Sequence, residues 1–121
     1  MTSSDQDKTT SISTLSLKSH YLTFINTFIV EPEKAEALLE NLTNATKEVF
    51  LHQAGFISAN LHLSHDRRKV VNYAQWRSKE DYEAMSKLPD VQSHMKRAAA
   101  LAIGFDPVDY ELREVICGVK A

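Results

Sequence analysis

The sequence predicts a single α+β domain in which strands and helices follow the order β-α-β-β-α-β. The chain has 121 residues, which suits one domain. Its hydrophobic residues switch repeatedly between a period of two, typical of strands, and a period near 3.6, typical of helices. Residues that break regular structure stand where the period changes, at Pro32, Gly55, Pro89 and Gly104. This order is that of a ferredoxin-like split unit, with both helices on one face of a four-stranded antiparallel sheet.

Residues 1–20 are predicted to form a mobile arm. Ten of them are Ser or Thr and none is aromatic, so the segment buries too little apolar surface to offset its ordering entropy. The alternation of Leu15 and Leu17 leaves open a short strand that lies on a partner. The folded domain is expected to span residues 21–121.

The first strand is predicted over residues 21–30, which are rich in β-branched and aromatic types. Alternation places Phe24, Asn26 and Phe28 on one face of that strand. Apolar residues then recur at helical spacing, which predicts an amphipathic helix over residues 32–53.

The second half of the domain repeats the pattern. Ser78, followed three residues later by Asp81, resembles a capping box and marks the start of a helix. The predicted elements are strands at 56–63 and 69–76, a helix from 79 to 88 that continues over 90–102 after Pro89, and a last strand at 108–116.

The sheet face turned away from the helices predicts a partner. It is expected to carry the apolar side chains of Ile25, Ile29, Val71 and Tyr73, too much apolar surface to leave in water on a small monomer. A two-fold dimer that packs two such faces together would bury it, so we expect a homodimer. Because the register of the second and third strands is not fixed by the sequence, the faces of Ser58, Asn60 and His62 stay open.

Composition limits the remaining classes of partner and cofactor. The net charge of −2 gives no electrostatic reason to bind nucleic acid or an anionic membrane. The longest uncharged stretch has 12 residues, whereas a transmembrane helix needs about 20. Since no secretory signal is visible, we expect a cytoplasmic protein. With one cysteine, no helical metal spacing among the histidines and no phosphate-binding glycine loop, we expect neither a metal nor a nucleotide cofactor.

The third predicted strand carries the most informative polar residues. Asn72 and Trp76 point the same way, about 13 Å apart. Asparagine is a poor strand residue, yet Asn26 stands on the first strand, which neighbours the third in this topology. Two carboxamides aimed at the helices are costly to bury unless partners, water or a ligand satisfy them. The alternative is a buried hydrogen-bonded pair that only orders the core.

The helices offer further candidates, and each has a plain structural explanation. Packing against the sheet alone would explain Tyr82. His94 lies at the edge of an apolar helix face, where a packed histidine is common. Lys96 and Arg97 are most simply solvated surface charges.

Three runs, Gly55–His62, Val70–Ser78 and Lys79–Met85, resemble the antibiotic biosynthesis monooxygenase family, and the resemblance extends over residues 21–115. It implies a dimeric α+β barrel. It also implies oxidation of anthrone-like aromatic polyketides to quinones by O₂, with no metal, flavin or haem. The pocket positions of that family are a strand Asn, a Trp four residues later, a Tyr on the next helix and, in some members, a first-strand Asn. They correspond here to Asn72, Trp76, Tyr82 and Asn26.

The same resemblance suggests substrate contacts on the second helix. A helix Arg that contacts substrate in one branch would fall at Arg97 or Lys96, and His94 is expected to bind substrate beside it. A second branch of this superfamily degrades haem and has a His on the second helix, for which His94 is the nearest candidate. That branch also has a helix Trp where this chain has Met85.

We therefore expect a cofactor-independent monooxygenase that oxidises an electron-rich aromatic substrate, an anthrone or a quinol, with O₂ as co-substrate. Asn72 and Trp76 would donate hydrogen bonds to the developing anion, and Asn26 would orient the substrate. If a protein base exists, it is His94 or Tyr82. The alternatives are a haem-degrading monooxygenase with His94 as axial ligand, or a non-catalytic dimer that binds a small aromatic molecule.

Overall fold

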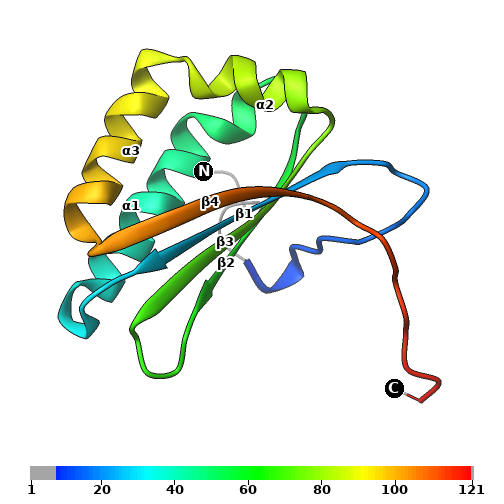
Figure 1. Cartoon of the computed structure of the whole chain (residues 1–121), viewed down its shortest axis with the longest axis horizontal. Helices are drawn as coiled ribbons and strands as arrows, with labels where there is room; N and C mark the ends of the chain where they lie inside the picture. The colour runs from blue at the N-terminus through cyan, green and yellow to red at the C-terminus, as the bar shows by residue number, and fades with distance from the viewer. Residues whose placement is uncertain (1–7, 121) are drawn as a thin grey trace.

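A four-stranded antiparallel sheet, with strand order β2-β3-β1-β4, carries all the helices of the domain on one face (Figure 1). The computed structural model describes residues 8–120. Its strands are β1 (Leu22–Ile29), β2 (Phe56–Leu63), β3 (Lys69–Trp76) and β4 (Gly104–Glu111). Its helices are α1 (Ala35–Glu48), α2 (Lys79–Ser86) and α3 (Pro89–Leu101), with short 3₁₀ turns η2 (Lys8–Thr10), η3 (Pro32–Lys34) and η4 (Phe50–His52). The predicted α+β, ferredoxin-like fold is confirmed.

The first helix is shorter than the sequence predicts. Pro32 opens the 3₁₀ turn η3, and α1 ends at Glu48 because Val49 leaves the helical conformation, with φ −123° and ψ −59°. After η4, Gly55 turns the chain into β2 with a positive φ of 82°. A side chain at Gly55 would also collide with the carboxylate of Asp81, so glycine is required there on two counts.

The predicted capping box opens α2. The Ser78 hydroxyl accepts a hydrogen bond from the backbone N–H of Asp81 at 3.1 Å. The Asp81 carboxylate accepts from Arg77 Nε at 2.8 Å and from Ser78 Oγ at 3.0 Å. These hydrogen bonds, that from Arg77 first, lower the pKa of Asp81. The chain then breaks as predicted, and Pro89 occupies the first turn of α3.

The last strand begins and ends earlier in the chain than the sequence predicts, since the predicted range is 108–116. The structure begins β4 at Gly104 and ends it at Glu111, so Pro107 lies inside the strand, opposite Asn26. A proline is tolerated there because β4 is an edge strand, where one side of the backbone needs no ladder hydrogen bonds. Residues 112–120 leave the sheet (Figure 1).

The core between sheet and helices has two adjoining parts. One part is a cluster of closely packed aliphatic and aromatic side chains, namely Phe28, Val30, Ala35, Leu38, Leu42, Val70 and Ala98. The other contains Ala45, Phe50, Ala74, Trp76, Met85 and Val91. Most residues of the second part line the cavity described below, together with Phe28 and Leu42 of the first part.

Strand register decides which polar residues face away from the helices. Ala59 pairs with Ala74 and Leu61 with Asn72, so Ser58, Asn60 and His62 point to the open face. Asn60 Nδ2 donates to the Tyr73 carbonyl at 3.0 Å, and Ser58 Oγ donates to Gln75 Oε1 at 2.7 Å. The open question left by the sequence is thereby answered.

The segment before β1 runs along this open face, on the side opposite the helices (Figure 1). Gln75 Nε2 donates to the Thr14 carbonyl at 3.0 Å, and Ser13 Oγ lies 3.3 Å from Ser58 Oγ. Residues 1–7 of the predicted arm lie outside the described residues, and mobility of the rest stays a prediction. The homodimer also stays a prediction. No helix within residues 8–120 is long and apolar enough to cross a membrane.

Candidate active site

An apolar cavity of about 230 Å³ lies between the sheet and the helices. Its floor comes from alternate residues of the two central strands, Phe24, Asn26 and Phe28 on β1 and Asn72, Ala74 and Trp76 on β3. Its roof comes from Tyr82 and Met85 of α2 and from Val91 and Met95 of α3. The three candidate catalytic residues and Tyr82 are therefore brought together, although they are spread over 57 residues of the sequence, from position 26 to position 82.

Asn26 and Asn72 are direct cross-strand neighbours. Asn26 is only 4% exposed. The Oδ1 atoms of both side chains are buried, and neither has a hydrogen-bond partner within residues 8–120. Because neither oxygen accepts from the other amide, the two carboxamides do not form the hydrogen-bonded pair that would only order the core. A buried acceptor without a partner costs about 1–3 kcal/mol, a cost that a polar group bound in the cavity would remove.

An aromatic cluster closes one end of the cavity. Trp76 is 2% exposed and its ring meets those of Phe56 and Tyr82 edge-on, with centroids 5.3 and 5.9 Å apart. The Tyr82 ring also lies 4.4 Å from that of Phe24. Such rings offer a flat aromatic molecule offset-stacked or edge-to-face contacts.

Burial raises the pKa of Tyr82 above its ordinary value of 10, and the negative charge of Asp109 raises it further. The phenol is thus held in its neutral form at physiological pH. A neutral phenol donates a hydrogen bond and is a poor proton acceptor. Of the two residues that the sequence offers as a base, Tyr82 is better suited to be a donor.

His94 and Arg97 are not brought to this cavity. They line a separate depression between α1 and α3, together with Glu48 and Asp90. Arg97 Nη2 lies 2.8 Å from His94 Nδ1, and Glu48 Oε1 lies 3.7 Å from His94 Nε2.

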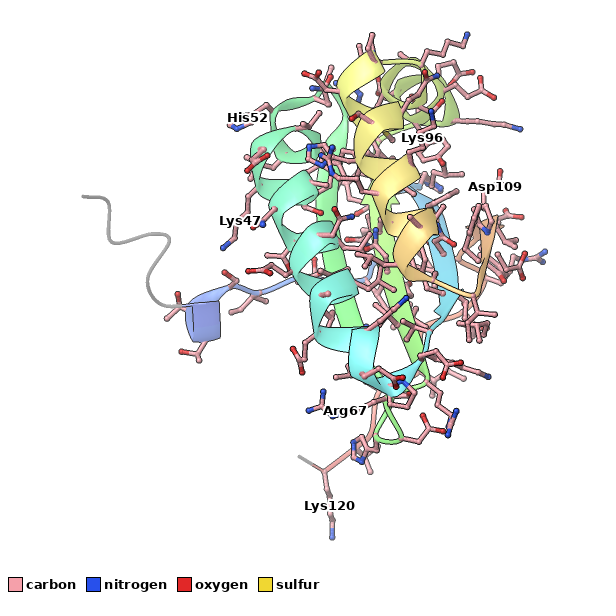
Figure 2. The ribbon with its side chains drawn as sticks, turned by 90° about the vertical axis from the view of Figure 1, so that its left-hand side faces the viewer. Lys47, His52, Arg67, Lys96, Asp109 and Lys120 are labelled. Carbon is pink, nitrogen blue, oxygen red and sulfur yellow. The ribbon has the colours of Figure 1, made fainter. Side chains whose placement is uncertain are left out.

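The helix phase explains this placement. Val91, Met95 and Ala98 form the side of α3 that packs toward the sheet. His94 and Arg97 each stand one position, about 100°, away from that side. Figure 2 shows Lys96 on the outer side of α3 as well, where it is exposed.

Haem does not fit the residues that line the cavity. Across the described part of the chain no histidine contributes to its wall, so no imidazole is available as an axial ligand there. Met85, 6% exposed, fills part of the roof. No cluster of His, Cys, Asp or Glu that could hold a metal ion is found among residues 8–120.

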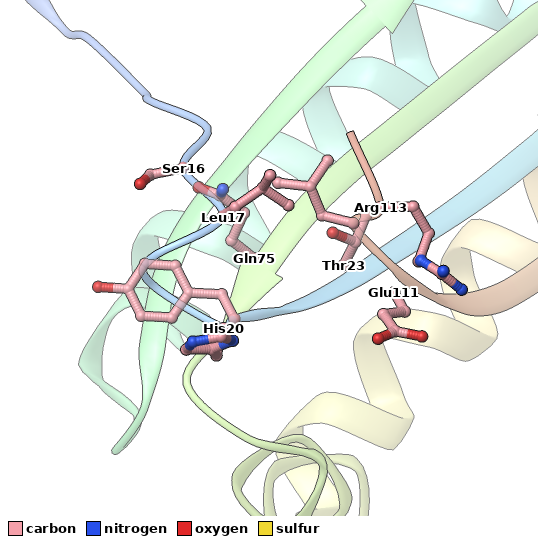
Figure 3. Close-up of a pocket in the computed structure, with 9 residues that line it drawn as sticks. Ser16, Leu17, His20, Thr23, Gln75, Glu111 and Arg113 are labelled. Carbon is pink, nitrogen blue, oxygen red and sulfur yellow. The ribbon is translucent and has the colours of Figure 1, made fainter. Parts of the chain in front are cut away.

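A larger depression of about 360 Å³ lies at the end of the open sheet face (Figure 3). Ser16, Leu17 and His20 of the segment before β1 frame it, together with Glu111 and Arg113 at the other chain end. It is more polar than the cavity under the helices, and it contains none of the residues that the sequence marks as candidates. The apolar cavity is therefore the better candidate for the active site.

Some residues of the cavity escape the sequence analysis. Phe105 and Pro107 line its opening from β4, and Ser86 and Gln92 line it from the helices. The β4 residues are missed because Pro107 is treated as lying before the last strand. If Pro107 is allowed within an edge strand, Phe105, Pro107 and Asp109 become alternate residues of that strand, and this pattern predicts that they share one face.

Comparison with known proteins agrees with this geometry. The profile of the family described as antibiotic biosynthesis monooxygenase matches residues 22–97. Tetracenomycin-F1 monooxygenase of Streptomyces glaucescens is 43% identical over 83 residues, which cover 69% of this chain and 74% of that protein.

Solved structures show the same fold. A monooxygenase from the gene ActVA-Orf6 of Streptomyces coelicolor, in complex with the ligand nanaomycin D, is 26% identical with a TM-score of 0.74. The match covers 86% of this chain and 99% of that one. SnoaB, a cofactor-independent oxygenase from Streptomyces nogalater, is 21% identical with a TM-score of 0.66, over 80% of this chain and 97% of that one. At that identity SnoaB supports the fold alone.

Proposed function

The chain belongs to the antibiotic biosynthesis monooxygenase family, and on that premise we propose that it oxidises an electron-rich polycyclic phenol, an anthrone or a quinol, with O₂ and without a bound cofactor. The observation that carries the proposal is the pair of unpaired carboxamides, Asn26 and Asn72, in the apolar cavity within residues 8–120. Among the described residues, the protein itself supplies no hydrogen-bond partner for these two buried oxygens, and a polar substrate would supply one.

These residues suit a reaction in which the substrate supplies its own electrons. Loss of a proton gives an anion, which adds O₂ to form a hydroperoxide. Loss of water then leaves a new carbonyl, so that CH₂ plus O₂ gives C=O plus H₂O. The protein has to exclude bulk water and stabilise the anion with fixed donors.

The donors are neutral groups of the cavity wall. A terminal amide without a partner can turn about its last torsion, which is broad and roughly two-fold, so Asn72 can present either its oxygen to a hydroxyl or its NH₂ to an anion. The Tyr82 phenol, whose pKa is raised, and the Trp76 indole N–H are further donors. Asn26, beside Asn72, orients the substrate.

Two relatives support a small organic molecule as substrate. One is the monooxygenase that acts on tetracenomycin F1. The other is the Streptomyces coelicolor monooxygenase that binds nanaomycin D. The aromatic cluster around Trp76 favours a flat, fused-ring molecule for this chain. The cofactor-independent chemistry is supported by a cavity wall that offers donors and apolar surface.

Oxygen uptake with a hydroxylated anthrone, together with quinone formation, tests the proposal. Asn72→Ala and Trp76→Phe should each lower the rate by roughly 10²–10³, the usual effect of losing one donor to an oxyanion. Asn60→Ala, on the open face of the sheet, serves as the matched control and should keep its activity. Dialysis against a chelator should leave the rate unchanged.

Two results would overturn the proposal. If wild-type protein binds the anthrone but consumes no O₂, the chain is a binding protein. If activity disappears with the chelator and returns with a metal ion, the reaction is not cofactor-independent.

A further inference from the structure

A carboxylate of β4, that of Asp109, lies on the same face of the sheet as the cavity. Phe105 and Pro107 line the opening from β4, and alternation along the strand carries Asp109 to the same face. Asp109 pairs in register with Phe24, whose ring lies 4.4 Å from that of Tyr82. Asp109 is exposed, and Figure 2 shows it on the edge strand β4.

The proposed reaction needs a proton acceptor that the cavity wall does not supply. Along the described chain the lining consists of apolar, amide, hydroxyl and indole side chains, with no carboxylate, imidazole or amine. Tyr82 is unsuited because its phenol is held neutral. His94 lies in the separate depression beside Arg97.

We propose that Asp109 takes the proton that the substrate loses before it reacts with O₂, an inference that rests on the proposed function. The bond from hydrogen to the substrate's oxygen or carbon breaks, and its electron pair stays on the substrate. The carboxylate of Asp109 becomes a carboxylic acid. After O₂ has added, Asp109 returns the proton to the peroxide anion, which becomes a hydroperoxide, and the carboxylate is thereby restored. The second hydrogen then leaves the same carbon as the O–O bond breaks, so that one oxygen stays as the carbonyl and the other leaves with both hydrogens as water.

The position of Asp109 matches the size of the substrate. The cavity of about 230 Å³ holds a fused-ring core with little room to spare, so substituents of the substrate reach the opening. A hydroxyl at the rim meets Asp109 there, while the buried end of the substrate contacts Asn72 and Trp76. Proton removal and stabilisation of the anion thus take place at opposite ends of one conjugated system.

On its own strand, Glu111 stands two residues from Asp109 and therefore on the same face of the sheet. From α2 the titratable group that faces Asp109 is Tyr82. Its β1 neighbour, Phe24, is apolar. On α3, Gln92 and Met95 at the cavity are uncharged, and Lys96 forms no ion pair with Asp109 among the described residues.

Asp109→Asn, compared with Asp106→Asn, tests the assignment. Asp106 stands on the same strand and pairs with Thr27, so its side chain lies on the opposite face of the sheet. With a hydroxylated anthrone, Asp109→Asn should lower kcat/KM by about 10²-fold or more, the usual contribution of a general base. Asp106→Asn should keep the wild-type rate.

A series of substrates of rising phenol acidity sharpens the test. A phenol that is ionised before it binds needs no base, so the loss in Asp109→Asn should shrink along the series. Independently of activity, ultraviolet titration should report a lower Tyr82 pKa in Asp109→Asn, with Tyr82→Phe identifying the signal among the four tyrosines.

The outcomes separate the two proposals. Wild-type protein without O₂ uptake contradicts the proposed function. An active wild type with Asp109→Asn equally active, or with the same loss for every substrate, overturns the role of Asp109 alone. An unchanged Tyr82 titration overturns it as well, because the carboxylate would then be too far from the cavity.

Discussion

Substituting Asn72 by leucine, whose side chain has the same branched arrangement of heavy atoms but no polar atom, should raise the free energy of unfolding while it abolishes most of the turnover. The reason lies in the carboxamide oxygens of Asn72 and Asn26, both buried and both without a partner in the part of the chain that the structure describes. Residues that serve only the fold are rarely left in this state, because a buried polar atom normally has a hydrogen-bond partner.

The magnitude follows from the burial. An unsatisfied buried acceptor costs about 1–3 kcal/mol, and leucine removes it without leaving a void. Asn72→Leu should therefore gain about 1–3 kcal/mol, or roughly 3–6 °C in Tm for each kcal/mol in a domain of this size. The rate should fall by roughly 10²–10³ if the amide is a donor to the anion.

Chemical denaturation and oxygen uptake on the same preparations measure both quantities. Asn60→Leu is the matched control, since its amide donates to the Tyr73 carbonyl and to Ser58 Oγ at 3.0 and 3.3 Å. That variant should lose stability. If Asn72→Leu loses stability as Asn60→Leu does, the Asn72 amide is paired in solution and serves the core, and the argument for a catalytic pair is refuted.

Three other predictions concern assembly and pH. Sedimentation should give twice the chain mass of 13.7 kDa at micromolar concentration, because the open sheet face needs cover; a monomer would contradict this. Deleting residues 1–18 should leave Tm nearly unchanged, because a Ser/Thr-rich arm buries little apolar surface; a loss of several degrees would show that the arm packs on the sheet, where Gln75 donates to the Thr14 carbonyl. Because the pKa of Tyr82 is raised in the folded state, the unfolded state loses its proton first, and stability should fall as pH rises above about 10. Tyr82→Phe should flatten that alkaline loss, as denaturation between pH 9 and 11 would reveal.

The sequence predicts best those elements whose local signals agree. Both β2 and β3 begin and end at the predicted residues, because each run of strand-forming residues is bounded by a turn. The start of α2 is also correct, since the Ser78 cap is a purely local hydrogen bond. The adjacency of Asn26 and Asn72 follows from the topology, because the first and third strands are neighbours in this fold.

The predictions are wrong where the position of a residue in the fold depends on segments that are distant in the sequence. Pro107 breaks a central strand but fits an edge strand, and the edge position of β4 is known only once the sheet is assembled. His94 is near the apolar side of α3 in sequence, yet a rotation of about 100° per residue carries it toward α1. Alternation places Asp109 on the same face of β4 as Phe105 and Pro107, but this can be deduced only once β4 is known to start at Gly104.

The cavity itself is a consequence of small residues at the centre of the sheet. Ala59 and Ala74 are paired across β2 and β3, and both line the cavity floor, where larger aliphatic residues would fill the space. Leu38, Val70 and Ala98 belong to the other half of the core and do not line the cavity. This half of the core contributes hydrophobic stabilisation in proportion to the apolar area that it removes from water. Asparagines in the hollow half can then be tolerated despite their cost, and the lining can vary with the substrate while the fold is kept.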